Sequence, residues 1–250
     1  MSDYYNIPRN PNWNYGGKRW RLSRSKIDLF QQCPRCFYLD NKLGLKRPPG
    51  YPFNLNSAVD SLLKTEFDIH RAKGEQHPLQ KKYGIDAVPV AHESLDIWRE
   101  NFKGVECTHK PTGFIVSGAI DDLWINPKTK EYIVVDYKAT AKSEAVTSLD
   151  QDWQDGYKRQ MEIYQWLLRQ NGLKTSNLGY FVYCTGRPDE KAFDGKLEFD
   201  IHLIEYVGND NWVEGTLKDI EKCLKSKKIP TANKDCDYCN YRAQINKVEQ

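Results

Sequence analysis

Two short stretches of this sequence place charged side chains beside apolar, β-prone residues. The first is Gly118-Ala-Ile-Asp-Asp122 and the second is Ile133-Val-Val-Asp-Tyr-Lys138. Asp136 and Lys138 are two residues apart, so on a strand both side chains point to the same face. Burying an aspartate and a lysine together is costly without polar partners. Because a divalent cation and a phosphate would supply partners for both, the pattern indicates a metal-dependent phosphodiesterase site.

A β-hairpin would bring the two stretches together. The turn-forming residues 126–130 separate two apolar runs, which is typical of a hairpin. In it, Asp121 and Asp136 can reach one Mg²⁺ ion, which prefers oxygen ligands, while Lys138 stabilises charge on a phosphate or holds the attacking water. Asp122 is the rival of Asp121, but strand alternation places it on the opposite face. From these residues alone, solvated charges at strand ends remain an alternative.

Four of the seven cysteines form two Cys-x-x-Cys pairs, Cys33 with Cys36 and Cys236 with Cys239. In a reducing compartment such pairs indicate a metal site rather than disulfides. Four thiolates can complete a tetrahedral zinc site or hold an iron–sulfur cluster. The other three cysteines stand alone, which is typical of small, partly buried thiols.

Basic and aromatic residues gather near the N-terminus, in residues 17–26. Lysine and arginine beside Trp20 suit phosphate contacts and base stacking, and a solvated basic tail is an equally good interpretation. The overall charge of +3 neither requires nor excludes nucleic acid. The basic residues that could contact a DNA strand are Lys18, Arg19, Arg21 and Arg24.

Hydrophobic periodicity predicts the elements that must position these residues. Residues 1–21 are expected to form an irregular basic and aromatic arm, and residues 73–90 a loop. Without an internal repeat or a long low-complexity linker, residues 22–250 are expected to form a single domain. The helix over 56–70 is expected to bury a stripe that includes Leu62 and Ile69. Helices are predicted over residues 22–33 (capped by Ser23 or Ser25), 56–70, 93–102, 153–171 and 213–223, and strands over 114–125 (one long strand or two), 131–138, 179–184 and 197–204.

The composition, with 39% hydrophobic and 28% charged residues, is that of a soluble globular protein. No apolar run approaches the ~20 residues that span a bilayer, and the first residues lack the apolar segment of a signal peptide. We therefore expect a cytoplasmic protein with no membrane partner.

The motifs, in this order, resemble the PD-(D/E)XK nucleases, in particular the RecB-like and AddB-like branch that includes CRISPR-associated RecB-type exonucleases. The resemblance spans roughly residues 22–242. It implies an α/β fold with a restriction-endonuclease-like core, in which helices flank a central mixed β-sheet and a four-cysteine metal site joins the two ends of the chain. Four motifs carry it: residues 22–39, a Ser-x-Ser start running into Cys-Pro-x-x-Phe-Tyr-Leu, then Gly118–Asp121, Val135–Lys138 and Gln160–Tyr164.

The resemblance also assigns roles to the residues of the hairpin. Asp121 and Asp136 would bind Mg²⁺ or Mn²⁺ together with the backbone carbonyl of Tyr137. Lys138 would orient or activate the attacking water.

Two further residues lie on the helix that follows. Gln160 and Tyr164 are one helical turn apart, and by resemblance they would support the active-site lysine or the bound DNA strand. For Tyr164, simple core packing is an equally good interpretation.

The chain departs from the family pattern in two places. Many relatives carry a metal-binding histidine in a Gly-x-x-x-His helix, whereas the matching segment Asn56–Asp60 places Asp60 there. An aspartate can ligate Mg²⁺ through oxygen, so Asp60 is a candidate ligand; His70 and His77 are alternatives. Iron–sulfur members usually place one cysteine near the start and three near the end, whereas this chain has two and two. The resemblance favours a [4Fe–4S] cluster on the four cysteines, and the symmetric pairing suits structural Zn²⁺.

The function implied is a metal-dependent, exonuclease-like DNA nuclease in repair, recombination or end processing. Its expected partner is single-stranded DNA or duplex ends. A helicase or recombination protein is a further expected partner, because the chain has no Gly-x-x-x-x-Gly-Lys-Ser/Thr loop of its own. One alternative, supported by Asp60, is a weakened or inactive nucleic-acid-binding protein that retains the fold. Another is a redox or metal-sensing cysteine protein.

Overall fold

The computed structural model describes residues 7–8, 10–50 and 54–249, which separate into two compact units. The terminal unit contains the described parts of residues 1–51, 108–117 and 211–250, and the core unit those of residues 52–107 and 118–210. The residue ranges of the two units alternate along the chain. The single domain expected after residue 21 stays a prediction.

A mixed β-sheet forms the centre of the core unit. In the described part of the chain its strand order is β2-β5-β6-β7-β8. β6 and β7 are parallel, while the other neighbouring pairs are antiparallel. The predicted α/β fold with a central mixed sheet is confirmed. The strands are β2 (Val88–Pro89), β5 (Asp122–Ile125), β6 (Tyr132–Ala141), β7 (Leu178–Gly186) and β8 (Phe199–Val207).

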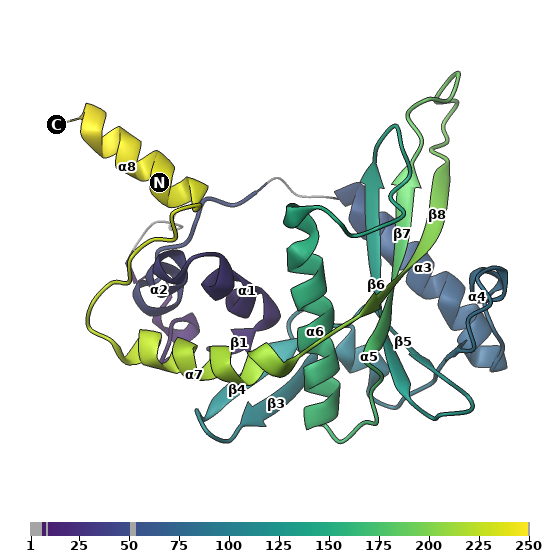
Figure 1. Ribbon diagram of the computed structural model, residues 1–250, viewed down its shortest axis with the longest axis horizontal. Coiled ribbons are helices and arrows are strands. Elements are labelled where there is room, and N and C mark those ends of the chain that lie inside the picture. Colours follow the sequence, from purple (N-terminus) through teal and green to yellow (C-terminus); the bar gives the residue numbers. More distant parts are fainter. Residues whose placement is uncertain (1–6, 9, 51–53, 250) are drawn as a thin grey trace. The chain divides into compact units, whose positions relative to one another are not determined.

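Helices α3 (Asn54–Lys73) and α6 (Asp155–Gln170) cover opposite faces of this sheet (Figure 1). Side chains alternate along β6, so Tyr137 packs against Phe67 of α3, whereas Asp136 contacts α6. The connection from β6 to β7 runs through α6, as a parallel pair requires. The unit also contains two shorter helices, α4 (Pro78–Lys82) and α5 (Leu95–Trp98), and the 3₁₀ helix η3 (Asp152–Gln154).

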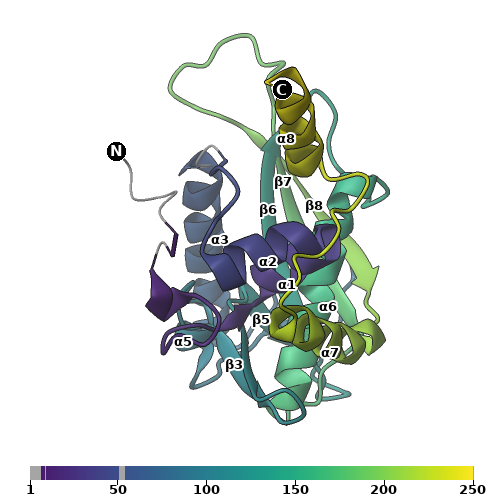
Figure 2. The ribbon, with the colours of Figure 1, turned by 90° about the vertical axis from the view of Figure 1, so that its left-hand side faces the viewer.

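The terminal unit is mainly helical, and several of its helices can be followed in Figure 2. It contains a small sheet in which β1 pairs in parallel with β4. Strands β3 and β4 each extend across the boundary between the units. The elements are the 3₁₀ helix η2 (Pro11–Trp13), β1 (Leu22–Ser23), α1 (Arg24–Gln32), α2 (Pro34–Leu43), β3 (Val105–His109), β4 (Phe114–Gly118), α7 (Asn211–Lys225) and α8 (Asp237–Val248).

Trp20 does not offer a face for base stacking. Its side chain is only 8% exposed, its Nε1 donates a hydrogen bond to Asn41 Oδ1 at 3.1 Å, and its ring meets Phe114 edge to face. Trp20 is therefore part of the packed terminal unit. Residues 1–6 and 9 of that arm lie outside the described residues.

Most predicted elements exist, with differences that have local causes. The first helix begins after its N-cap Ser23, but Pro34 starts a second helix, because proline lacks the N–H that would continue the first. On α3, Leu62 and Ile69 are 69% and 53% exposed whereas Phe67 is buried, so the buried stripe is narrower than predicted. The helix predicted over 93–102 shrinks to α5, the predicted loop over 73–90 contains α4 and β2, and α8 was not predicted. No described helix is both long and apolar enough to cross a membrane.

Candidate active site and cysteine cluster

Asp136 and Lys138 form an ion pair on the α6 face of β6. Asp136 is fully buried and its Oδ1 accepts a hydrogen bond from Gln160 Nε2 at 2.7 Å. Lys138 Nζ lies 3.4 Å from Gln160 Oε1. Gln160 therefore contacts the acid and the lysine at once, and fixes both relative to α6.

Tyr164, also on α6, contacts Gln160. Its hydroxyl accepts a hydrogen bond from Gln160 Nε2 at 3.0 Å, and its ring lies against Gly118. A Cβ atom at Gly118 would be only 2.7 Å from Tyr164 Cε1, which explains why glycine opens the Gly118–Asp121 motif. Tyr157, also on α6, places its ring 4.7 Å from Lys138 Nζ.

Asp121 lies just before β5 and reaches the free edge of β6. Its Oδ2 accepts a hydrogen bond from the backbone N–H of Tyr137 at 2.9 Å. The N–H and C=O of one strand residue point to the same edge, so the Tyr137 carbonyl faces the side on which Asp121 stands. Asp121 and the backbone of Tyr137 thus meet at this edge of β6, and Asp136 lies next to Tyr137 with its side chain on the α6 face.

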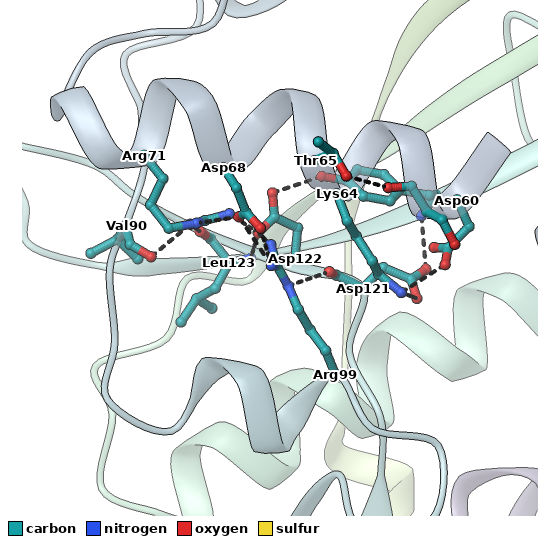
Figure 3. A network of polar contacts seen from close by, with 12 residues as sticks. Asp60, Lys64, Thr65, Asp68, Arg71, Val90, Arg99, Asp121, Asp122 and Leu123 are labelled. Carbon is teal, nitrogen blue, oxygen red and sulfur yellow. Dashed lines mark hydrogen bonds and ion pairs between the residues drawn. The ribbon is translucent and has the colours of Figure 1, made fainter. Parts of the chain in front are cut away.

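Asp122 has a different role from its neighbour (Figure 3). It pairs with Val135 across the hairpin, which places its side chain on the α3 face. There the fully buried carboxylate forms ion pairs with Arg71 and Arg99 and accepts a hydrogen bond from the Tyr137 hydroxyl at 2.7 Å. Two arginines and a phenol satisfy this carboxylate, so Asp122 holds the core together.

Asp60 lies near Asp121, and Lys64 stands between them (Figure 3). Lys64 Nζ is 2.8 Å from Asp60 Oδ2 and 3.6 Å from Asp121 Oδ1. Burial and the negative charge of Asp121 raise the pKa of Asp60, against the opposing effect of Lys64. Lys64 is not among the predicted site residues, although its position four residues after Asp60 on a helix indicates that the two side chains meet.

Lys138 is a cation at neutral pH. Burial on its own lowers its pKa, but the charges of Asp136 and Asp121 outweigh burial and raise the pKa above the usual value. An ammonium group at this position can donate hydrogen bonds to water or phosphate, and it can stabilise negative charge.

The oxygen donors suit a hard cation such as Mg²⁺ or Mn²⁺. In the described part of the chain, however, Asp60, Asp121 and Asp136 are not gathered to the spacing of metal ligands. The lysine contacts described above occupy the carboxylates instead, so an ion would have to displace them. The two alternative histidines contact other groups: His77 Nε2 is 2.9 Å from Glu66, and the His70 ring packs against His77.

The four cysteines of the two Cys-x-x-Cys pairs converge in the terminal unit. Their sulfur atoms all lie within 4.8 Å of one another. Cys36 Sγ is 3.6 Å from the sulfurs of both Cys236 and Cys239, and Cys33 Sγ is 3.9 Å from that of Cys239. All four are free thiols, and the predicted cluster of cysteines near the two ends of the chain is confirmed.

Polar groups contact the sulfurs of Cys33 and Cys236, whereas burial raises the pKa of Cys36 and Cys239. For Cys33, burial acts to raise the pKa, but hydrogen bonds from the backbone of Cys36 and Asn233 outweigh it and lower the pKa to about 7. Arg47 Nη2 donates to Cys236 Sγ at 3.4 Å. Thiolates are the form in which cysteine binds metals.

A model of the PD-(D/E)XK nuclease superfamily matches residues 54–244. The chain belongs to this superfamily. Its members are usually metal-dependent nucleases that use Mg²⁺ or Mn²⁺. The matched range includes the residues of the site described above, which are Asp60, Asp121, Asp136, Lys138, Gln160 and Tyr164. It also includes Cys236 and Cys239, whereas Cys33 and Cys36 precede it. No curated protein matches the chain.

Proposed function

We propose that this PD-(D/E)XK protein is a Mg²⁺- or Mn²⁺-dependent DNA nuclease of the RecB-like branch. The observation that carries the proposal is the group at the edge of β6, where Asp121 binds the Tyr137 N–H while Asp136 and Lys138 share Gln160. These are the acids, the lysine and the glutamine of the ordered family motifs.

Asp60, Asp121, Asp136 and the Tyr137 carbonyl would hold the ion, which supplies Lewis-acid activation of water and phosphate. Lys138 donates hydrogen bonds to the attacking water and stabilises the developing charge. Gln160 holds the side chains of Asp136 and Lys138 in position.

The role of Lys64 depends on whether the site holds a cation. Without a cation, its ammonium offsets the charges of Asp60 and Asp121. With a cation held by Asp60 and Asp121, Lys64 would leave the two carboxylates and would be available to a substrate phosphate.

The proposed substrate is single-stranded DNA or the end of a duplex, cut by an exonuclease-like reaction in repair, recombination or end processing. The order of the four motifs supports this assignment. Exposed basic residues of the arm, such as Lys18 and Arg19, supply phosphate contacts. A helicase or recombination protein would supply the unwinding.

The test is cleavage of end-labelled single-stranded DNA, duplex DNA and RNA of matched sequence, with Mg²⁺, Mn²⁺ or a chelator. We expect metal-dependent cleavage of DNA, and Lys138→Met should lower its rate about 100-fold or more, because one preorganised charge contributes this much in a transition state. Lys128→Met, in the exposed turn of the hairpin, is the matched control and should cleave normally. Wild-type protein that cuts none of the substrates, or a Lys138→Met variant with an unchanged rate, would contradict the proposal.

Asp60 supports a second candidate, a nucleic-acid-binding protein with weakened or no activity. It replaces the histidine of many relatives, and Lys64 neutralises it in this structure. DNA binding that persists without any cleavage in the same assay would establish this candidate.

A further inference from the structure

We infer that the four-cysteine site binds one tetrahedral metal ion of the zinc type, rather than the [4Fe–4S] cluster that the family resemblance implies. The inference goes beyond the proposed nuclease function and does not depend on it, because all four cysteines belong to the terminal unit. It rests on the spacing of the sulfur atoms.

That spacing fits one ion. With Zn–S bonds of about 2.3 Å, four sulfurs at the corners of a tetrahedron lie about 3.8 Å from one another. Three of the six separations, at 3.6, 3.6 and 3.9 Å, lie on both sides of this value, and all six are within 4.8 Å. The chain therefore places its sulfurs where a single central ion would hold them.

Two other uses of the cysteines fit less well. In a [4Fe–4S] cluster each thiolate binds a different iron, so the irons hold the sulfurs further apart than one ion does. The four thiols here would have to separate before a cluster could enter. A disulfide needs a sulfur–sulfur distance of about 2.0 Å, and none of the measured separations approaches it.

Arg47 provides an independent reason to place anionic sulfur here. Its guanidinium is positioned by Gln32 Oε1, 2.9 Å from Nη1, and by the ring of Tyr238, 4.6 Å from Cζ. Gln32 precedes Cys33, and Tyr238 lies between the last two cysteines, so both ligand segments hold the arginine. Four thiolates around a divalent ion keep a net charge of about −2, which this cation on Cys236 Sγ partly offsets. Such hydrogen bonds to ligand atoms are typical of metal sites.

The test is the metal content of the full chain, expressed with both zinc and iron available and purified without oxygen. We expect about one zinc per chain, no acid-labile sulfide and no broad visible absorption. Exchange into Co²⁺ should then produce sulfur-to-cobalt charge-transfer bands that saturate at about one ion per chain. About four irons with four sulfides per chain would overturn the inference, and so would a protein that holds no metal and takes up no Co²⁺.

Two variants show whether the ion sits on these sulfurs. Cys36→Ser removes the thiol that lies 3.6 Å from two of the others, and it should lower the intensity of the charge-transfer bands and weaken Co²⁺ binding at least tenfold. Cys223→Ser changes a partly buried single cysteine of the same unit and should still bind one ion. Unchanged Co²⁺ spectra in Cys36→Ser would overturn the assignment. Should this variant fail to fold, the metal and sulfide content of the wild-type chain decides the question.

Discussion

Asp121 and Asp122 follow each other in the chain, but their carboxylates have different partners. Asp121 is partly exposed at the edge of β6, next to Lys64, whereas Asp122 is buried between Arg71 and Arg99. Strand alternation separates the two aspartates, since neighbouring residues point to opposite faces. One carboxylate is thereby available for chemistry while the other stabilises the fold.

These different environments predict opposite results for the same substitution. Asp122→Asn should lower the free energy of unfolding by about 3–5 kcal/mol, because it removes the buried charge that Arg71 and Arg99 share and leaves them only the half-exposed Asp68. Asp121→Asn should change stability by less than about 1 kcal/mol and abolish metal-dependent cleavage. Denaturant titration and the nuclease assay, run on both proteins, measure the two effects. Equal stability of the two variants would show that Asp122 does not hold the core.

The sequence predicts that the side chains of Asp121 and Asp122 point to opposite faces, but it does not predict the contact between Lys64 and Asp121. Asp121 was preferred over Asp122 from the period of a strand, and the structure places Asp122 on the opposite face. The contact of Lys64 with Asp121 joins a helix to a loop 57 residues later in the chain. Local periodicity carries no information about such a contact.

At the scale of elements, α6 and the start of the hairpin fit together closely. Gly118 lets the Tyr164 ring approach, and Tyr164 in turn contacts Gln160, which contacts both charged residues of β6. The glycine therefore acts on the site through a helix, without touching any reacting group.

A methyl group at this glycine should disturb the packing of α6. Gly118→Ala would place Cβ 2.7 Å from the Tyr164 ring, and we expect it to destabilise the protein by about 1–3 kcal/mol, as overpacking does. Gly215→Ala is the matched control: it lies within α7 and a Cβ there meets no atom within 4 Å. It should stabilise by about 0.5–1 kcal/mol, because glycine is a poor helix residue. Denaturant titration of both variants measures the expected loss and the expected gain of stability. A Gly118→Ala protein of wild-type stability would contradict the packing argument.

Strongly periodic elements were predictable and short ones were not. α6 was predicted close to its observed limits, since a long apolar pattern specifies it. The turn of the hairpin was also predicted, but residues 114–125 form two strands, β4 and β5, which belong to different sheets. α4, β2 and α5 have two to five residues each, too few for a period to emerge. α8 was missed for another reason: it has no apolar face that packs, so hydrophobic periodicity could not reveal it.

At the scale of the whole molecule, the cysteine site joins segments that are about 200 residues apart in the chain. α8 begins directly after Cys236, and none of its residues, all of which the structure describes, is buried. A helix that buries no side chain gains little from packing. Its attachment therefore depends on Cys236, Cys239 and the contact of Tyr238 with Arg47.

Removing the metal should therefore release α8 while leaving the core sheet intact. After treatment with a strong zinc chelator, we expect amide hydrogens of α8 and of the α1–α2 junction to exchange with solvent much faster. Those of β6 and α6 should exchange as before, since local openings of separate units are independent. Hydrogen exchange followed by mass spectrometry measures both regions in one experiment. Unchanged protection of α8 would show that the metal does not hold it.

With its ion in place, the four-cysteine site would also determine how the protein responds to mechanical force. A pull on the two ends of the chain enters at residues 33–36 and 236–239, the two places at which cysteines bind the ion. The load then passes across metal–sulfur bonds, and the roughly 200 residues between them bear no tension. In a single-molecule extension experiment, these residues would lengthen only after the metal–sulfur bonds had broken.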